Sequence, residues 1–489
     1  MKRRGAVLLF AVVAAVGLVA GPAGATGFGH GHARPLVVDD DLRGCHGWRA
    51  THRTIQSAIG DAGEGATIWV CPGRYNETVK VDKPGLTLLG ANAGRDATTG
   101  ERRHESVVTN LVPDPDALGT VQLLNDDITW DGFTIQGVFG RPNAPGMYTS
   151  PAFSGYSVLN TVFEDNGTGL HLGSDGANPT VVCRNLFVAN NEFNGPAGAI
   201  GIYSNEGARQ VLITGNRFER HNTSAILFAD VDLDPATPEV LQQDVVIEGN
   251  ISVDDLSFAV IYNSTRVRVT GNDVRARVGD EKFPGPASAI RIGARDHDVV
   301  VDRNRIRSAS GDGIDVTDAG EKGREPAAPT NVDVLHNKVK HAELLGIDVS
   351  ASAVHEYEVR GNRALANGQG GIHLGPLADD AQVTGNVALG NGGAVGFDCQ
   401  DESDGEGPTD GTAGTENTWQ DNVGVRADPA GICAAPTTTD QPTGHGHGHG
   451  KDHGKRWGHK QHHRHHKQHH EHGKPRPDPC ECSTLPWRF

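Results

Sequence analysis

The chain has 489 residues, a formal net charge of −17 at pH 7, 65 glycines and only 5% aromatic residues. Residues 441–489 carry +5 and the basic N-terminus +3, which leaves −25 on the remaining body. A body with this much negative charge argues against nucleic acid as a partner, because a protein needs a basic surface to bind nucleic-acid phosphates. It is compatible with calcium, with cationic partners, or with solubility alone.

The N-terminus has the three parts of a secretory signal. Basic residues 2–4 precede an apolar run over 6–20, and small residues follow up to Ala25. We predict a signal peptide over 1–25 with cleavage after Ala25, then an extended leader over 26–53, and a secreted, extracellular protein. An uncleaved N-terminal anchor is the alternative. No later segment is long and apolar enough to predict a transmembrane anchor.

A short amphipathic helix is expected over residues 54–62, where Ile55, Ala58 and Ile59 share one helical face. It precedes the first strand of the main domain, expected at 67–70. A helix in this position would cover the open end of a stack of strands, which otherwise exposes aliphatic side chains and unpaired amides.

An aliphatic strand followed by an asparagine step recurs through the middle of the chain. The intervals between successive asparagines are 34, 22, 32, 33, 25 and 24 residues, which indicates a solenoid repeat with insertions in some coils. Short β-branched runs such as 245–247 and 299–301 indicate strands rather than helices. Asparagine tolerates the left-handed backbone region better than any residue except glycine, so we expect a Gly-Asn or Arg-Asn step after each strand to form a repeated sharp corner. These residues are Asn216, Asn250, Asn272, Asn304, Asn337, Asn362 and Asn386.

The segment TIQSAIGDAGEGATIWVCPGRYNETVKV, residues 54–81, resembles the opening of bacterial secreted right-handed parallel β-helix proteins of the pectate-lyase-like superfamily. Together with the asparagine coils, the resemblance covers about residues 54–433. It implies an all-β fold, a right-handed parallel β-helix with an N-terminal capping helix and a closing coil over 415–433. Residues 434–489 are expected to form a disordered, His-rich basic tail.

Seven cysteines fit an oxidising compartment but leave one unpaired. We predict two disulfides, Cys45 with Cys71 and Cys399 with Cys433, each holding one end of the stack. Cys183 is expected to be a buried apolar residue on a strand rather than a reactive thiol. The remaining two cysteines lie in the tail.

A second strand, of the form small residue, aliphatic, x, aliphatic, recurs in each coil. Because strand side chains alternate, x is expected to face solvent and to stack on the x of the next coil. Rungs about 4.8 Å apart would bring Asp315 and Asp348 together, which requires a cation, a shared proton or Arg291 nearby. In chain order the x positions are His171, Gly201, Leu227, Ile261, Arg291, Asp315, Asp348 and His373.

The resemblance implies a polysaccharide groove along this ladder, since lyases and glycosidases of the superfamily carry Asp, Arg, Lys and His on an outward strand face, commonly with calcium. Arg291 is then a candidate base or uronate clamp, Asp315 and Asp348 are candidate acid/base groups or Ca²⁺ ligands, and His373 is auxiliary. The alternative is a surface ladder in which Arg291 merely neutralises Asp315. Three insertions beside the ladder would form cleft walls, over residues 229–243, 278–288 and 317–329.

The tail contains closely spaced histidines that could wrap around a Zn²⁺, Cu²⁺ or Ni²⁺ ion. The alternative is a cationic tail attracted to cell-wall polyanions. The candidate metal ligands are His445, His447, His449, His462, His463, His465, His466, His469, His470 and His472.

These observations predict a secreted monomer that engages an extracellular polysaccharide, with uronate-containing polymers as candidates and lyase or hydrolase activity as the chemistry. The alternative function is a non-catalytic surface or scaffold protein with a metal-binding histidine tail. The sugar, and the bond acted on, stay open at this stage.

Overall fold

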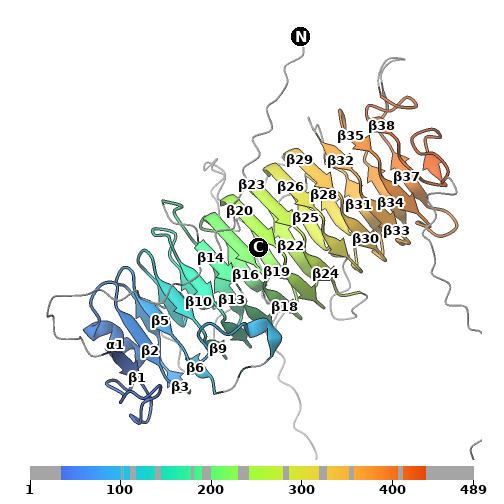
Figure 1. Cartoon of the computed structure of the whole chain (residues 1–489). Coiled ribbons are helices and arrows are strands. Elements are labelled where there is room, and N and C mark those ends of the chain that lie inside the picture. The colour runs from blue at the N-terminus through green and yellow to red at the C-terminus, as the bar shows by residue number, and fades with distance from the viewer. Residues whose placement is uncertain are drawn as a thin grey trace, which may run out of the picture. The chain divides into compact units, whose positions relative to one another are not determined.

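A computed structural model describes residues 35–436, apart from 101, 103, 111–116, 138–144, 178–180, 185, 190–199, 230–241, 279–285, 319–327, 352–356 and 406–410. Within these residues, all strands pair in parallel and form three sheets of 14, 13 and 12 strands. Successive coils contribute one strand to each sheet, so the strands follow one another along the stack (Figure 1). The predicted parallel β-helix is confirmed by these three sheets.

Sheet A, the 14-stranded sheet, consists of β1 (Leu36–Val38), β2 (Thr67–Val70), β5 (Thr87–Leu89), β8 (Thr129–Asp131), β11 (Ser157–Leu159), β14 (Val181–Arg184), β17 (Arg209–Thr214), β20 (Gln242–Glu248), β23 (Ser264–Thr270), β26 (His297–Asp302), β29 (Thr330–Leu335), β32 (Glu358–Arg360), β35 (Gln382–Thr384) and β38 (Thr418–Gln420). Sheet B, with 12 strands, consists of β3 (Gly73–Asn76), β6 (Ser106–Thr109), β9 (Thr134–Gln136), β12 (Val162–Glu164), β15 (Phe187–Ala189), β18 (Arg217–Glu219), β21 (Ile251–Val253), β24 (Asp273–Arg275), β27 (Arg305–Ile306), β30 (Lys338–Lys340), β33 (Arg363–Leu365) and β36 (Val387–Leu389).

Sheet C, with 13 strands, consists of β4 (Val79–Val81), β7 (Val121–Leu123), β10 (Pro145–Thr149), β13 (Thr168–His171), β16 (Ile200–Ser204), β19 (Ser224–Phe228), β22 (Ser257–Ile261), β25 (Ile290–Ile292), β28 (Ile314–Val316), β31 (Leu345–Val349), β34 (Gly370–Leu374), β37 (Phe397–Asp401) and β39 (Ala427–Asp428). The described residues also contain the helix α1 (Ile55–Asp61) and the 3₁₀ turn η1 (Ala97–Thr99).

The core is a set of aliphatic columns inside the coil. In sheet A, alternate residues of β20, β23, β26 and β29 point inward, and the inward positions of these strands are in register. The β-branched runs of the sequence supply these columns, because Val and Ile pack well on a pleated surface. One such column is Val245, Val267, Val299 and Val332, all fully buried.

The side chains of the repeated asparagines form a buried amide ladder on the inner side of the corners. The predicted step does form the corner, and its left-handed residue is the one before the asparagine, as at Gly271 with φ 65° and Arg303 with φ 53°. The asparagine side chain itself is buried. Asn304 Nδ2 donates to the Val269 carbonyl (2.8 Å) and to Asn337 Oδ1 (3.0 Å), which also accepts from the Asn304 backbone N–H (2.9 Å). The amide therefore satisfies backbone groups that the corner leaves unpaired inside the coil.

At the N-terminal end, α1 covers the stack as predicted, with Ile55, Ala58 and Ile59 buried. The Glu77 carboxylate accepts hydrogen bonds from the first two backbone N–H groups of the helix, at 2.8 and 2.9 Å. Within the leader predicted over 26–53, the segment β1 already belongs to the coil, because it pairs with β2.

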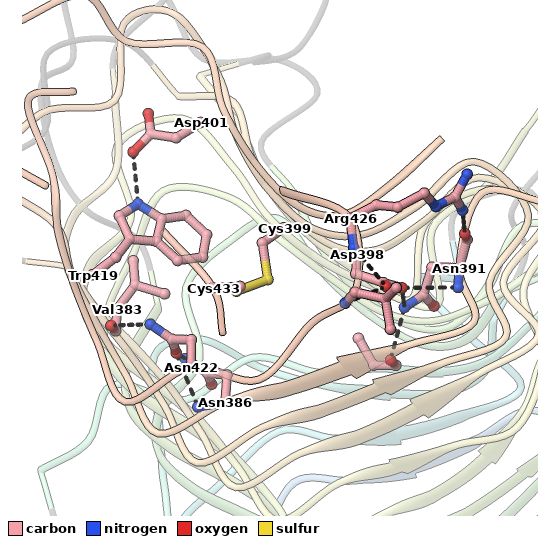
Figure 2. Close-up of a disulfide and its surroundings, with 12 residues drawn as sticks. Val383, Asn386, Asn391, Asp398, Cys399, Asp401, Trp419, Asn422, Arg426 and Cys433 are labelled. Atoms are coloured by element: carbon pink, nitrogen blue, oxygen red, sulfur yellow. Dashed lines mark hydrogen bonds between the residues drawn. A yellow bond between two sulfur atoms is a disulfide. The ribbon is translucent and has the colours of Figure 1, made fainter. Parts of the chain in front are cut away.

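The disulfide between Cys45 and Cys71 is confirmed and lies at this N-terminal end. At the other end, the predicted disulfide between Cys399 and Cys433 is confirmed as well (Figure 2). Cys183 is buried as predicted, and burial raises the pKa of its thiol to about 12. A thiol with so high a pKa is a structural residue rather than a nucleophile.

The closing coil fixes buried polar groups beside the second disulfide. Trp419 Nε1 donates to the Asp401 carboxylate at 2.7 Å, and Asn422 Nδ2 donates to the Val383 carbonyl at 2.8 Å (Figure 2). Asn422 also accepts from Asn386, so the amide ladder extends into the last coil. The core is therefore closed at this end by hydrogen-bonded groups.

Three sequence predictions fall wholly or almost wholly outside the described residues: the signal peptide over 1–25, the disordered tail over 434–489, and the metal-binding histidines from His445 to His472. Over the part of the chain that the structure describes, no helix combines the length and apolarity needed to cross a bilayer.

Candidate active site on sheet C

Four of the predicted site residues form one column on adjacent strands of sheet C. Arg291 of β25 is in register with Asp315 of β28, Asp315 with Asp348 of β31, and Asp348 with His373 of β34. Figure 1 shows these strands in succession along the stack. The regular parallel register thus brings together four charged residues from four coils.

The predicted column is wrong at two of its other positions. Arg291 is in register with Val260, not Ile261, and Leu227 is in register with Tyr203, not Gly201. Ile261 is fully buried. The slip at Ile261 is one residue, which moves its side chain to the opposite face because strand side chains alternate. The slip at Gly201 is two residues, since Tyr203 occupies the column there.

Arg291 and Asp315 form a partly buried ion pair. Arg291 Nε donates to Asp315 Oδ2 at 2.7 Å, and the Ser288 hydroxyl donates to the same oxygen at 3.1 Å. Burial lowers the pKa of Arg291, but the charge of Asp315 and the neighbouring Tyr262 outweigh it, so the pKa is raised overall. A guanidinium held in this way is poorly suited to act as a base.

Asp312 joins the column residues in a cluster of three carboxylates. One oxygen each from Asp312, Asp315 and Asp348 lies within 4.8 Å of the other two. The Leu345 backbone N–H donates to Asp312 Oδ1 at 2.9 Å. Burial, together with the charges of Asp348 and Asp315, raises the pKa of Asp312 to about 6. This carboxyl therefore exchanges its proton near neutral pH.

The third carboxylate is held by a histidine. His373 Nδ1 lies 2.6 Å from Asp348 Oδ1, and its Nε2 lies 3.6 Å from Glu402 Oε1. Burial lowers the pKa of His373, but its hydrogen bond to Asp348 and the charge of that carboxylate outweigh burial and raise it. Both side chains of the pair are 14% exposed, so the site opens to solvent on this side.

Sequence reasoning missed Asp312, Ser288 and Glu402. Asp312 stands three residues before Asp315 in a Gly-Asp-Gly segment, which is ordinary turn chemistry and therefore carried no clear signal. The insertions that were expected to form cleft walls lie largely outside the described residues, in segments 230–241, 279–285 and 319–327.

His171, at the other end of the column, belongs to a covered aromatic row. Its ring centroid lies 5.4 Å from that of Tyr148 and 5.2 Å from that of Tyr203. The two tyrosines are only 6% and 8% exposed, so these rings pack against their surroundings and offer little surface to a ligand. Burial lowers the pKa of His171, which favours the neutral ring.

A calcium ion fits the acidic cluster poorly. Ca²⁺ prefers six to eight oxygen ligands. Here the Arg291 guanidinium already lies 2.7 Å from one Asp315 oxygen and adds a positive charge beside the cluster. Calcium binding by Asp315 and Asp348 stays a prediction. The chemistry proposed for these carboxyl groups does not require the ion.

No protein-family model matches the chain, and no curated protein does so. Several solved structures are similar in architecture. The A-module of a mannuronan C-5 epimerase from Azotobacter vinelandii is 14% identical over 78% of this chain and 91% of its own, with a TM-score of 0.41. The catalytic unit of a GH87 α-1,3-glucanase from Streptomyces thermodiastaticus is 16% identical over 83% of this chain and 71% of its own, with a TM-score of 0.45.

A DFA-IIIase from Arthrobacter chlorophenolicus, solved without its lid, is 14% identical over 75% of this chain and 89% of its own, with a TM-score of 0.43. These similarities concern the fold alone.

Proposed function

We propose that this protein acts on an extracellular polysaccharide and hydrolyses it by acid–base catalysis at the carboxylate cluster of sheet C. The observation that carries the proposal is the convergence of Asp312, Asp315 and Asp348, with oxygens within 4.8 Å of one another. Paired carboxyl groups in different protonation states are the machinery that most glycoside hydrolases use.

The environments of the three carboxyl groups separate their roles. Asp312, with its pKa raised to about 6, holds a proton for the leaving oxygen of a glycosidic bond. Asp348, held by His373 at 2.6 Å and with an oxygen within 4.8 Å of one of Asp312, is at the separation of a retaining pair, so it is the candidate nucleophile. The glycosyl-enzyme bond that it forms is then hydrolysed by a water molecule whose proton Asp312 accepts. Arg291 balances the charge of Asp315, which reduces the repulsion between the three carboxyl groups.

Lyase activity, the other reaction expected from the sequence, requires a base that removes a carbon-bound proton from a uronate. The raised pKa of Arg291 argues against this residue as that base. Its guanidinium can still clamp a substrate carboxylate through the nitrogen atoms that Asp315 does not engage. We therefore place hydrolysis ahead of elimination and keep both as measurable outcomes.

Two disulfides among the described residues are compatible with an oxidising compartment. This agrees with the secreted location that the N-terminal sequence predicts. An extracellular protein meets polysaccharides as part of its surroundings, so the location supports the proposed substrate class.

The proposal is tested by incubating the protein with pectic, alginate and glycosaminoglycan polymers. New reducing ends without absorbance from unsaturated uronate indicate hydrolysis, and both signals together indicate a lyase. The Asp312→Asn variant should lose the activity, whereas Asp421→Asn, at an exposed turn position far along the chain, should keep it. Activity that survives Asp312→Asn and Asp348→Asn would show that the chemistry lies elsewhere.

A further inference from the structure

A basic surface lies on sheet B, away from the carboxylate cluster. Arg305 of β27 is in register with Lys338 of β30, and Lys338 with Arg363 of β33, so three cationic side chains follow one another in one column. A pocket lies beside this column. It is lined by Arg305, Ile306, Arg307, Lys338, Lys340 and His341. We call these five basic residues and Arg363 the basic patch.

The charges of the basic patch are largely uncompensated. Asp273 pairs with Arg307, at 2.5 Å between carboxylate and guanidinium. Within the described residues, Arg305, Lys338, Lys340 and Arg363 form no ion pair. Burial and then the neighbouring charges of Lys340, Arg305 and Arg363 lower the pKa of Lys338, which reflects repulsion within the patch.

The pocket also contains a buried donor without a partner. Arg307 Nε is buried and has no hydrogen-bond acceptor among the described groups, although the same guanidinium binds Asp273 through Nη2. The Arg307 side chain is 38% exposed overall, but a buried N–H without an acceptor is unfavourable, and an acceptor that reaches Nε would relieve that cost. The patch is thus a solvent-accessible cluster of cationic groups, most of them without a counter-charge, that an anion can reach.

We propose that the basic patch binds a linear acidic polysaccharide and thereby holds it at a second, non-catalytic site on sheet B. The cationic column repeats about every 4.8 Å along the stack, so a polymer with carboxylates at regular intervals can meet several rungs at once. Because the body carries a net charge of −25, a cluster of cationic side chains gives a polyanion a local point of attachment on a surface that is acidic on average. This inference does not depend on hydrolysis at Asp312.

The test uses the full chain carrying Asp312→Asn, so that no polymer is consumed during the measurement. Calorimetric titration with polygalacturonate is compared with a neutral linear glucan of equal length. Lys338→Gln with Arg363→Gln should weaken polygalacturonate binding about tenfold and reduce its dependence on salt. The matched control, Arg184→Gln with Arg268→Gln, removes the same charge from exposed positions of sheet A and should leave affinity nearly unchanged.

A second readout locates the contact. Carbodiimide coupling joins polymer carboxylates to nearby lysine amines, and mass spectrometry should find the products at Lys338 and Lys340. The proposal is overturned if coupling is confined to lysines of the tail and the Lys338/Arg363 variant binds as tightly as its parent. Equal affinity for the neutral glucan would also overturn the proposal, and so would tighter binding of duplex DNA. The same holds if the variant loses self-association while its glycan binding is unchanged. Coincident thermal unfolding curves confirm that the variants are folded.

Discussion

Arg291 Nε lies 2.7 Å from Asp315 Oδ2, across two adjacent strands of sheet C. This ion pair neutralises one carboxylate of the cluster, and His373 holds a second one at Asp348. Asp312 is left without an ion pair among the described residues, in a position where burial and its acidic neighbours raise its pKa to about 6. Catalysis should therefore depend most strongly on the proton of Asp312.

Replacing Asp312 by Asn should lower kcat by about 10²- to 10⁴-fold, because the amide has no acidic proton to give to the leaving group. Asp421→Asn is the control, since it makes the same change at an exposed position with φ 56°, a conformation that Asn adopts readily. Initial rates of reducing-end release measure the effect. Equal rates for both variants would remove Asp312 from the mechanism.

The same Asp312→Asn change should stabilise the fold at pH 7 by about 1–3 kcal/mol, because it removes a buried charge that its neighbours repel. The amide oxygen can still accept the Leu345 N–H. Urea unfolding at pH 7 measures the difference. A destabilised variant would mean that the carboxylate makes stabilising contacts that outweigh the repulsion.

Activity should fall as pH rises through about 6, the pKa of Asp312, since only the protonated acid can donate. Stability follows the same direction. The folded pKa lies above the ordinary value of 3.8, so the folded state binds more protons between these values and stability falls as pH rises from about 4 to 6. Both pH dependences should weaken in Asp312→Asn. A wild-type rate that rises steadily from pH 5 to 8 would contradict the assignment of Asp312 as the acid.

His373→Gln should destabilise the protein by about 1 kcal/mol at pH 6 and by less at pH 9. The pKa of His373 is raised by Asp348, so the stabilisation is complete below its ordinary value of 6.5 and is lost as pH rises through the folded value. Unfolding curves at the two pH values give the comparison, with the exposed His297→Gln as control. An effect that grows with pH would reverse the sign of the proposed coupling.

Asn304→Ala should destabilise the protein by about 2–4 kcal/mol, because it leaves the Asn272 donors and the Val269 carbonyl unpaired inside the coil. Gln382→Ala, which removes an exposed amide from β35, should cost at most about 0.5 kcal/mol. Chemical unfolding measures both. Similar losses for the two variants would show that the amide ladder contributes little.

The alternative function predicted for the histidine tail has its own test. Calorimetry should detect zinc or copper binding by the full chain and no such binding after removal of residues 441–489, which hold 12 of the 24 histidines. Protonation should weaken binding below about pH 6, since metal competes with protons for the imidazole nitrogens. Metal binding that survives truncation would place the site in the β-helix instead.

The coil, its capping helix and the two disulfides could be predicted from local patterns and from the ends of the repeat. The sequence also placed Arg291, Asp315, Asp348 and His373 at equivalent positions of successive coils. Local periodicity is sufficient for this, since parallel strands of a solenoid stack in register and alternate their side chains.

The residues that complete the site beside this column depend on how separate coils and their turns pack together. Asp312 joins Asp315 and Asp348 because a turn before β28 directs it toward the column, and a Gly-Asp-Gly segment does not specify that direction. Val260 replaces Ile261 in the column because one residue of register exchanges the two faces of a strand. The basic patch likewise exists only when β27, β30 and β33 lie side by side, since its charges come from separate coils.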